Sequence, residues 1–315
     1  MTNSLLARFA ENIFWLARYM ERAENLARII DIAETHARDE AGGQDWKAVL
    51  EMNSDVKRFT EMHGEIAPGN VIYFYLLNRD NPNSIVSSVT YARENARSLR
   101  HLISTEMWSH LNVFQTWLTG LRRRDVTAKK LAGICGRIKQ ECQAHTGITE
   151  GTLYQDQGAC FYWIGKSVER LDQATRLIDI GYRQSLLLGP DRDKDSHWNA
   201  LLRFASGYQA YRRTHRVNMR PAEVVRFLAF DGNFPRSLLT SVETAQRHVR
   251  RLEDGFGIES GREALGILDE IRSRFLETDI QAVLDTDLHG YLDEIQRRLQ
   301  DCTVALGKRC FGHLE

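Results

Sequence analysis

The chain carries one stretch of sequence twice, and the two copies keep an almost constant separation. Residues 14–22 and 162–170 align without a gap at an offset of 148 residues. Later segments continue the match at offsets of 152 and 153: 46–50 with 198–202, and Pro82 with Pro235. A tandem duplication leaves this pattern, and the period is too long for a solenoid repeat. We therefore predict two helical modules, residues 1–150 and 151–315, related by a pseudo-two-fold axis. Whether they share one core stays open.

Few prolines and a regular apolar spacing indicate that both copies are helical. The chain has 5 prolines among 315 residues. Apolar residues recur at i, i+3, i+4 and i+7, whereas strict alternation is nearly absent, so we expect an all-α helical bundle. Asn81 before Pro82 predicts a helix start, and Pro235 predicts the equivalent one. The predicted helices are 4–40, 46–62, 70–78, 82–120 and 125–146 in copy one, and 158–188, 196–214, 221–230, 235–254, 261–284 and 287–306 in copy two.

The composition disfavours two classes of partner. Lys plus Arg and Asp plus Glu each number 42, so no basic excess favours a nucleic acid. The longest apolar run, residues 71–77, is far shorter than the roughly 20 residues that cross a bilayer. The first residues lack the apolar core of a secretory signal, and the 5 cysteines include no CxxC pair. These features predict a cytoplasmic protein with free thiols that binds neither nucleic acid nor membranes.

Each copy has a Glu-Arg pair on its first long helix. A helical projection places Arg22 within the apolar arc and Glu21 outside it, beside two further apolar side chains. Arg170 and Glu169 repeat these positions in copy two. Because an unpaired guanidinium or carboxylate is costly to desolvate, each pair should have fixed partners on a helix that is covered on more than one side.

Two interpretations of these pairs stay open. They could form a structural ion-pair network that fixes helix register, since buried ion pairs are costly to break on one side. Alternatively, the pseudo-two-fold axis could bring Glu21-Arg22 and Glu169-Arg170 face to face as a small site for a ligand or a partner peptide. Catalysis by two carboxylates would require a raised pKa and a cleft, and the sequence indicates neither.

A second candidate binding feature is a stripe of arginines on the helix after Pro82. Arg93, Arg97 and Arg100 lie along one edge of its apolar face. Copy two keeps only Arg250, the counterpart of Arg97. The stripe is either an ion-paired edge or an anion site, and the complete set occurs in copy one.

No pattern in the sequence indicates a cofactor, a metal centre or a nucleophile. The chain has no GxxxxGKS, GxxxxGKT, HExxH or GxSxG motif, and no glycine-rich turn after a strand. Its 10 histidines are scattered, without ligand spacing near cysteines or carboxylates. The residues alone therefore identify no reaction, and we expect no cofactor.

Three ordered motifs resemble the bacterial alpha-E family, which is named for helices that carry a Glu-Arg motif. Residues 8–25, which include Glu21-Arg22, are similar to the first signature of that family. Residues 81–85 with 92–97 and 106–108 are similar to the second, and residues 165–170 to the third. Together the matches extend over nearly the whole chain.

The resemblance implies partners rather than an activity. Alpha-E proteins are typically encoded beside, or fused to, a circularly permuted ATP-grasp ligase. A transglutaminase-like cysteine peptidase, and sometimes a proteasome-like peptidase, is encoded nearby. This implies a non-catalytic helical accessory or scaffold protein in a peptide-modifying or peptide-synthesising system. Two alternatives stay open: an enzyme of the same pathway that uses Glu21, Glu169 and the arginines, or a homodimeric structural protein.

Overall fold

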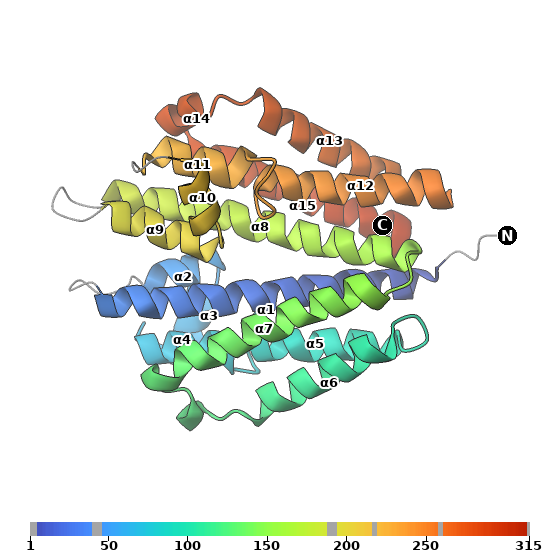
Figure 1. The fold of residues 1–315 in the computed structure, drawn as a ribbon, viewed down its shortest axis with the longest axis horizontal. Helices are drawn as coiled ribbons and strands as arrows, with labels where there is room; N and C mark the ends of the chain where they lie inside the picture. The colour runs from blue at the N-terminus through green and yellow to red at the C-terminus, as the bar shows by residue number, and fades with distance from the viewer. Residues whose placement is uncertain (1–4, 40–45, 188–193, 216–218, 258–260, 314–315) are drawn as a thin grey trace. The chain divides into compact units, whose positions relative to one another are not determined.

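The computed structural model describes residues 5–39, 46–187, 194–215, 219–257 and 261–313, which form fifteen α-helices, one short 3-10 helix and no strand (Figure 1). The all-α prediction is confirmed. The described residues divide by their contacts into two compact units, residues 12–162 and residues 163–315 with the residues up to Glu11. We call them the first and the second unit. The division into two compact units does not show that the two halves of the chain arose by duplication. The duplication of modules 1–150 and 151–315, and the pseudo-two-fold axis between them, therefore stay predictions.

Four long helices surround the core of the first unit: α1 (Ala7–Asp39), α5 (Ile85–Ser98), α6 (Thr105–Gly120) and α7 (Ala128–Thr152). α5 packs on α6, and α6 packs on α7. Asn12 donates to Ser98 Oγ at 2.7 Å and joins α1 to α5, while Lys139 pairs with Asp31 at 2.6 Å and joins α7 to α1. The short helices between α1 and α5 are α2 (Trp46–Met52), α3 (Val56–His63) and α4 (Pro68–Leu76).

The second unit also has four long helices, which are, in chain order, α8 (Gln157–Leu187), α12 (Leu238–Phe256), α13 (Arg262–Glu277) and α15 (Leu288–Cys310). α12 packs on α13, and α13 packs on α15. Trp163 of α8 stacks on His248 of α12, and His289 of α15 lies 3.1 Å from the Asp179 carboxylate of α8. The shorter helices are α9 (Lys194–Phe204), α10 (Tyr208–Thr214), α11 (Pro221–Phe230) and α14 (Ile280–Thr286).

Four of the predicted helices are interrupted, and each interruption has a local cause. The predicted helix 46–62 breaks at Ser54, where φ is +56°, and 196–214 breaks at Ser206, where φ is +60°. A residue in the left-handed region ends a helix. Glycine commonly adopts this region and therefore marks a helix end in the sequence, whereas serine does not. The predicted helix 82–120 ends at Ser98, and Ser104 begins another by accepting the N–H of Met107 at 3.1 Å. Asp279, the N-cap of α14, divides 261–284 in the same way.

The helix starts predicted at Pro82 and Pro235 are three residues too early. Ser84 Oγ caps α5 by accepting the N–H of Ser87 at 3.2 Å, and Ser237 Oγ caps α12 by accepting the N–H of Thr240 at 3.0 Å. A serine N-cap stabilises a helix by about 0.5–2 kcal/mol relative to alanine. Each proline therefore belongs to the turn before its helix.

Candidate functional site

In both Glu-Arg pairs the glutamate is buried and the arginine is partly exposed to solvent. Glu21 on α1 and Glu169 on α8 are each 1% exposed, whereas Arg22 and Arg170 are partly exposed. The helical projection was therefore wrong about which member of each pair lies deeper. Phe14, which lies beside Glu21 on the helix surface, is also fully buried. This confirms the expectation that α1 is covered on more than one side.

An amide side chain one turn later contacts each buried carboxylate. Asn25 Nδ2 donates to Glu21 Oε1 at 3.5 Å, and Gln173 Nε2 donates to Glu169 Oε1 at 2.7 Å. Residues i and i+4 are neighbours on one helix face, so the spacing of each pair permits this bond. A carboxylate that is removed from water needs such donors. Each glutamate is thus part of the interior hydrogen bonding of its own unit.

A polar cluster that the sequence did not reveal surrounds Asp55 in the first unit. Asp55 immediately precedes α3 and is 2% exposed. Asn83 Nδ2 donates to both of its carboxylate oxygens at 3.1 Å, and Arg58 pairs with Oδ1 at 3.0 Å. The positive charge of Arg22 also acts on this carboxylate. We call Arg22, Asp55, Arg58, Tyr75 and Asn83 the Asp55 cluster.

Burial dominates the protonation equilibria of the Asp55 cluster. It raises the pKa of the Asp55 carboxyl above its ordinary value of 3.8, while the hydrogen bond from Asn83 and the charges of Arg58 and Arg22 oppose part of that rise. Burial, and then the nearby charge of Asp55, raise the pKa of Tyr75 well above 10.0. Tyr75 therefore stays protonated at neutral pH, and its hydroxyl donates to the backbone oxygen of Val49 at 3.5 Å.

The Asp55 cluster joins two motifs that are far apart in the sequence. Arg22 belongs to the motif 8–25, and Asn83 belongs to the motif 81–85. Asp55 lies in neither of them. The signal that could have revealed it is the run Asn53-Ser54-Asp55, because three turn-forming residues inside a predicted helix indicate a break.

The corresponding region of the second unit is apolar. The offset of 152 residues pairs Asp55 with Gly207. A Cβ atom on Gly207 would lie 2.9 Å from Phe227 Cε1 and 3.1 Å from Phe234 Cζ, and these two rings stack with centroids 4.7 Å apart. Arg170 donates instead to the backbone oxygen of Pro235 at 3.3 Å. The two Glu-Arg pairs therefore have different surroundings.

The arginine stripe is divided between α5 and the turn that follows it. Arg93 and Arg97 lie on α5, but this helix ends at Ser98, so Arg100 lies beyond it although the predicted helix 82–120 included Arg100. All three side chains are at least partly exposed. The stripe is therefore a surface feature of the first unit, but it is not one continuous helix edge.

Neighbouring side chains already contact the arginines of this stripe. Glu94 pairs with Arg93 at 2.6 Å and with Arg97 at 3.0 Å. The guanidinium carbons of Arg93 and Arg100 lie 5.3 Å and 5.2 Å from the ring centroid of Trp108 on α6. The Arg97 side chain is 67% exposed although it pairs with Glu94. In the structure, Arg93 and Arg97 therefore form the ion-paired edge that was one of the two interpretations of the stripe.

Within the described ranges, no group of three or more His, Cys, Asp or Glu side chains is placed to hold a metal ion. None of the described helices combines the length and apolar character needed to cross a membrane. No disulfide joins the 5 cysteines, all of which are described. Burial raises the pKa of the Cys135 thiol to about 12, so this thiol stays protonated at neutral pH.

The chain is similar to proteins that have no established activity. Residues 5–311 match the model of the Alpha-E family, described as a predicted alpha-helical domain with a conserved ER motif. The uncharacterized proteins Rv2567 of Mycobacterium tuberculosis and Mb2597 of Mycobacterium bovis are each 22% identical over 325 residues, which is 95% of this chain and 35% of theirs. The chain thus spans about a third of the length of the curated relatives it matches. No solved structure matches it.

Proposed function

Because this chain belongs to the Alpha-E family, we propose that it is a non-catalytic helical accessory protein of a peptide-modifying or peptide-synthesising system. Its partners in this proposal are a circularly permuted ATP-grasp ligase and a transglutaminase-like peptidase, with a proteasome-like peptidase as a further candidate. These partners are the ones that the resemblance to the family implies. The structure supports the non-catalytic part of the proposal through the placement of the Glu-Arg pairs.

The observation that carries the proposal is the burial of both motif glutamates. A general acid or base must reach the reacting atoms, directly or through one water. Glu21 and Glu169 are each 1% exposed and accept hydrogen bonds from amides on their own helices. Their carboxylates are therefore placed to hold the interior of each unit together, and a substrate would not contact them without rearrangement.

The length of the relatives also supports an accessory role. In the mycobacterial proteins the matched region is 35% of the chain, so a domain similar to this one is joined there to a longer polypeptide. A domain that acts beside other domains needs a surface for them. We assign contacts with a partner to Arg22 and the stripe Arg93, Arg97 and Arg100 in the first unit, and separately to Arg170 in the second unit, with Glu21 and Glu169 as the buried residues that position Arg22 and Arg170.

The test is direct binding to the ATP-grasp ligase of the same cells. The tagged protein is used to isolate its partners, which are identified by mass spectrometry, and binding is then measured by calorimetry with the purified ligase. The variant R93Q/R97Q/R100Q should weaken binding by tenfold or more. The matched control is R213Q/R226Q/R262Q, which removes three exposed arginines from the second unit and should bind like the wild type.

The variant E21Q/E169Q separates a role in binding from a role in folding. If the glutamates position the adjacent arginines, this variant should bind more weakly while its circular dichroism spectrum stays helical. A wild-type protein that does not bind the purified ligase would reject the proposed partner. Equal losses in the stripe variant and in its control would reject the assigned surface.

The burial argument applies to Asp55 as well as to the motif glutamates. Burial raises the pKa of the Asp55 carboxyl, as it does for many general acids, but Asp55 is 2% exposed and a substrate would not contact it without rearrangement. An enzyme that uses Asp55 would lose turnover in D55N while it kept ligase binding. The accessory role predicts that D55N leaves the rate of the complete ligase and peptidase system within about twofold of the wild type.

A further inference from the structure

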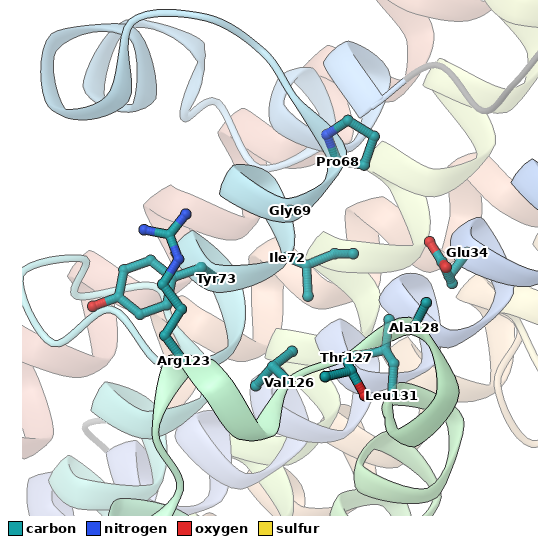
Figure 2. A pocket seen from close by; sticks show the side chains of 10 residues that line it. All are labelled: Glu34, Pro68, Gly69, Ile72, Tyr73, Arg123, Val126, Thr127, Ala128 and Leu131. Carbon is teal, nitrogen blue, oxygen red and sulfur yellow. The ribbon is translucent and has the colours of Figure 1, made fainter.

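A cleft of about 300 Å³ opens in the first unit, and none of the residues of the candidate site lines it (Figure 2). It lies between α4, the 3-10 turn Arg123–Asp125, the start of α7 and the later part of α1. Its lining is apolar at Ile72, Val126 and Leu131. The volume is at the lower end of the range for small-molecule pockets, so the cleft suits a small ligand.

Two neutral groups hold Arg123 in the cleft wall and leave most of its donors unused. Its guanidinium carbon lies 4.7 Å from the ring centroid of Tyr73, and Nη2 donates to Asn70 Oδ1 at 2.7 Å. A guanidinium has five N–H donors, of which the bond to Asn70 uses one, and the contact with the ring uses none. Among the described residues no carboxylate forms an ion pair with Arg123. Its side chain is thus positioned in advance to bind an anion.

The residues around Arg123 add to the positive potential on this side of the cleft. Asp125 is the one acidic residue among 122–130, whereas four exposed residues there are basic: Arg122, Arg124, Lys129 and Lys130. The charge of Arg123 also acts on His63, whose pKa is lowered first by burial and then by this charge. An anionic group that reaches Arg123 would therefore be stabilised.

The rest of the lining favours a ligand with a single negative charge and an apolar body. Glu34 is the one acidic side chain in the lining, and it already has an interaction partner within the protein, so we assign it no contact with the ligand. Its charge would oppose a second negative group in so small a cleft. The apolar side chains of the lining could not solvate such a group either. A phosphate or a dicarboxylate therefore fits poorly.

We propose that this cleft binds a small aliphatic monocarboxylate, with its carboxylate on the N–H donors of Arg123 and its apolar body against Ile72, Val126 and Leu131. A carboxylate fits the planar fork of a guanidinium with two parallel hydrogen bonds, and the lining removes the aliphatic body from water. A free short-chain acid and the C-terminal residue of a peptide both present this chemistry. The inference goes beyond the proposed function and does not depend on it, because none of these residues belongs to the proposed partner contacts.

The test titrates the protein with related probes and follows binding by NMR. Isocaproate has the carboxylate and a branched aliphatic body, isocaproamide lacks the charge, acetate lacks the body, and adipate adds a second carboxylate. Isocaproate should bind with a Kd in the low-millimolar range or below, and each of the other three should bind about tenfold more weakly or worse. N-acetyl-leucine distinguishes the two sources: binding tighter than that of isocaproate assigns a peptide C-terminus, and weaker binding assigns a free acid.

Two variants connect the probes to Arg123. R123Q should weaken the binding of isocaproate by about tenfold or more, because glutamine carries no charge and no fork of donors. R124Q removes an exposed neighbour that does not line the cleft, so it should bind isocaproate like the wild type. Thermal unfolding of each variant checks that it is folded.

His63 gives a second readout that does not depend on affinity. Burial and then the charge of Arg123 lower its pKa, so a carboxylate bound to Arg123 should raise that pKa toward its ordinary value of 6.5. In R123Q the pKa of His63 should be raised without any ligand, and isocaproate should not change it further. No binding of isocaproate, equal binding of the amide, equal effects of R123Q and R124Q, or an unchanged His63 pKa at saturation would each overturn the proposal.

Discussion

Replacement of Asn83 by alanine should destabilise the first unit by an amount that depends on the charge of Asp55. The substitution removes the amide that donates to both carboxylate oxygens at 3.1 Å, while Asp55 remains 2% exposed. A hydrogen bond to a charged group contributes about 1.5–3 kcal/mol, and a buried acceptor that loses its donor keeps its desolvation cost. Because Arg58 still contacts the carboxylate, we expect a loss of about 1.5–3 kcal/mol at pH 7 rather than more.

The sign of the pH dependence follows from the raised pKa of Asp55. Its pKa in the folded protein lies above the ordinary value of 3.8, so the folded state binds the proton more tightly than the unfolded state does. The stability contributed by this proton is present below pH 3.8 and is lost as the pH rises through the folded-state pKa. Asn83 opposes the rise in pKa, so N83A should raise it further. The cost of N83A should therefore be largest above that pKa and smallest in acid.

A double-mutant cycle measures this coupling. Urea unfolding of the wild type, N83A, D55N and the double variant, at pH 7 and at lower pH, gives the interaction free energy of the two side chains. N233A removes an exposed asparagine of the second unit and serves as the control. We expect coupling of about 1 kcal/mol or more at pH 7. Because an asparagine at position 55 keeps an acceptor oxygen but carries no charge, equal costs of N83A with and without the D55N change would show that the charge of Asp55 does not strengthen this hydrogen bond, and the reasoning would be refuted.

Three further predictions concern other positions. E21Q should lower the melting temperature by several degrees because Glu21 is 1% exposed, whereas E61Q at an exposed glutamate should not; equal melting curves would contradict a structural role. S84A and S237A each remove an N-cap bond and should cost about 0.5–2 kcal/mol in urea unfolding, and the loss should be similar in the two units. Burial lowers the pKa of His248 to about 4, so its ring should titrate near that value by NMR. Stability should fall as the pH drops from 6.5 toward 4, and H248Q should remove that dependence; a midpoint near 6.5 would contradict it.

The long helices could be predicted from the sequence because their apolar spacing continues over many turns. Their interruptions could not all be predicted, for two different reasons. Ser104 and Asp279 are N-cap residues in the structure, but the apolar spacing continues across them, and the predicted helices 82–120 and 261–284 therefore included them. Ser54 and Ser206 adopt positive φ without being glycine, and such a conformation depends on the packing around it rather than on the residue type.

The candidate site was only partly predictable, because its contacts join distant segments. A helical projection uses one helix at a time, so it could indicate that Glu21 and Arg22 need partners but could not name them. The position of Asp55 beside Arg22 and Asn83 is set by the turn before α3 and the turn before α5 together. The cleft at Arg123 gave no signal, because its lining residues come from four separate segments.

The aromatic packing at Gly207 bears on how the two halves of the chain can evolve. Under the predicted duplication, both copies began with the same residue at this position and have since diverged. An aspartate at position 207 would require Phe227 and Phe234 to move, because their ring atoms would lie 2.9 Å and 3.1 Å from its Cβ. Several changes would have to occur together, and the intermediates would carry a clash or a cavity. The halves are therefore no longer interchangeable, and a chimaera that exchanges this turn should fold only if the two phenylalanines are exchanged with it.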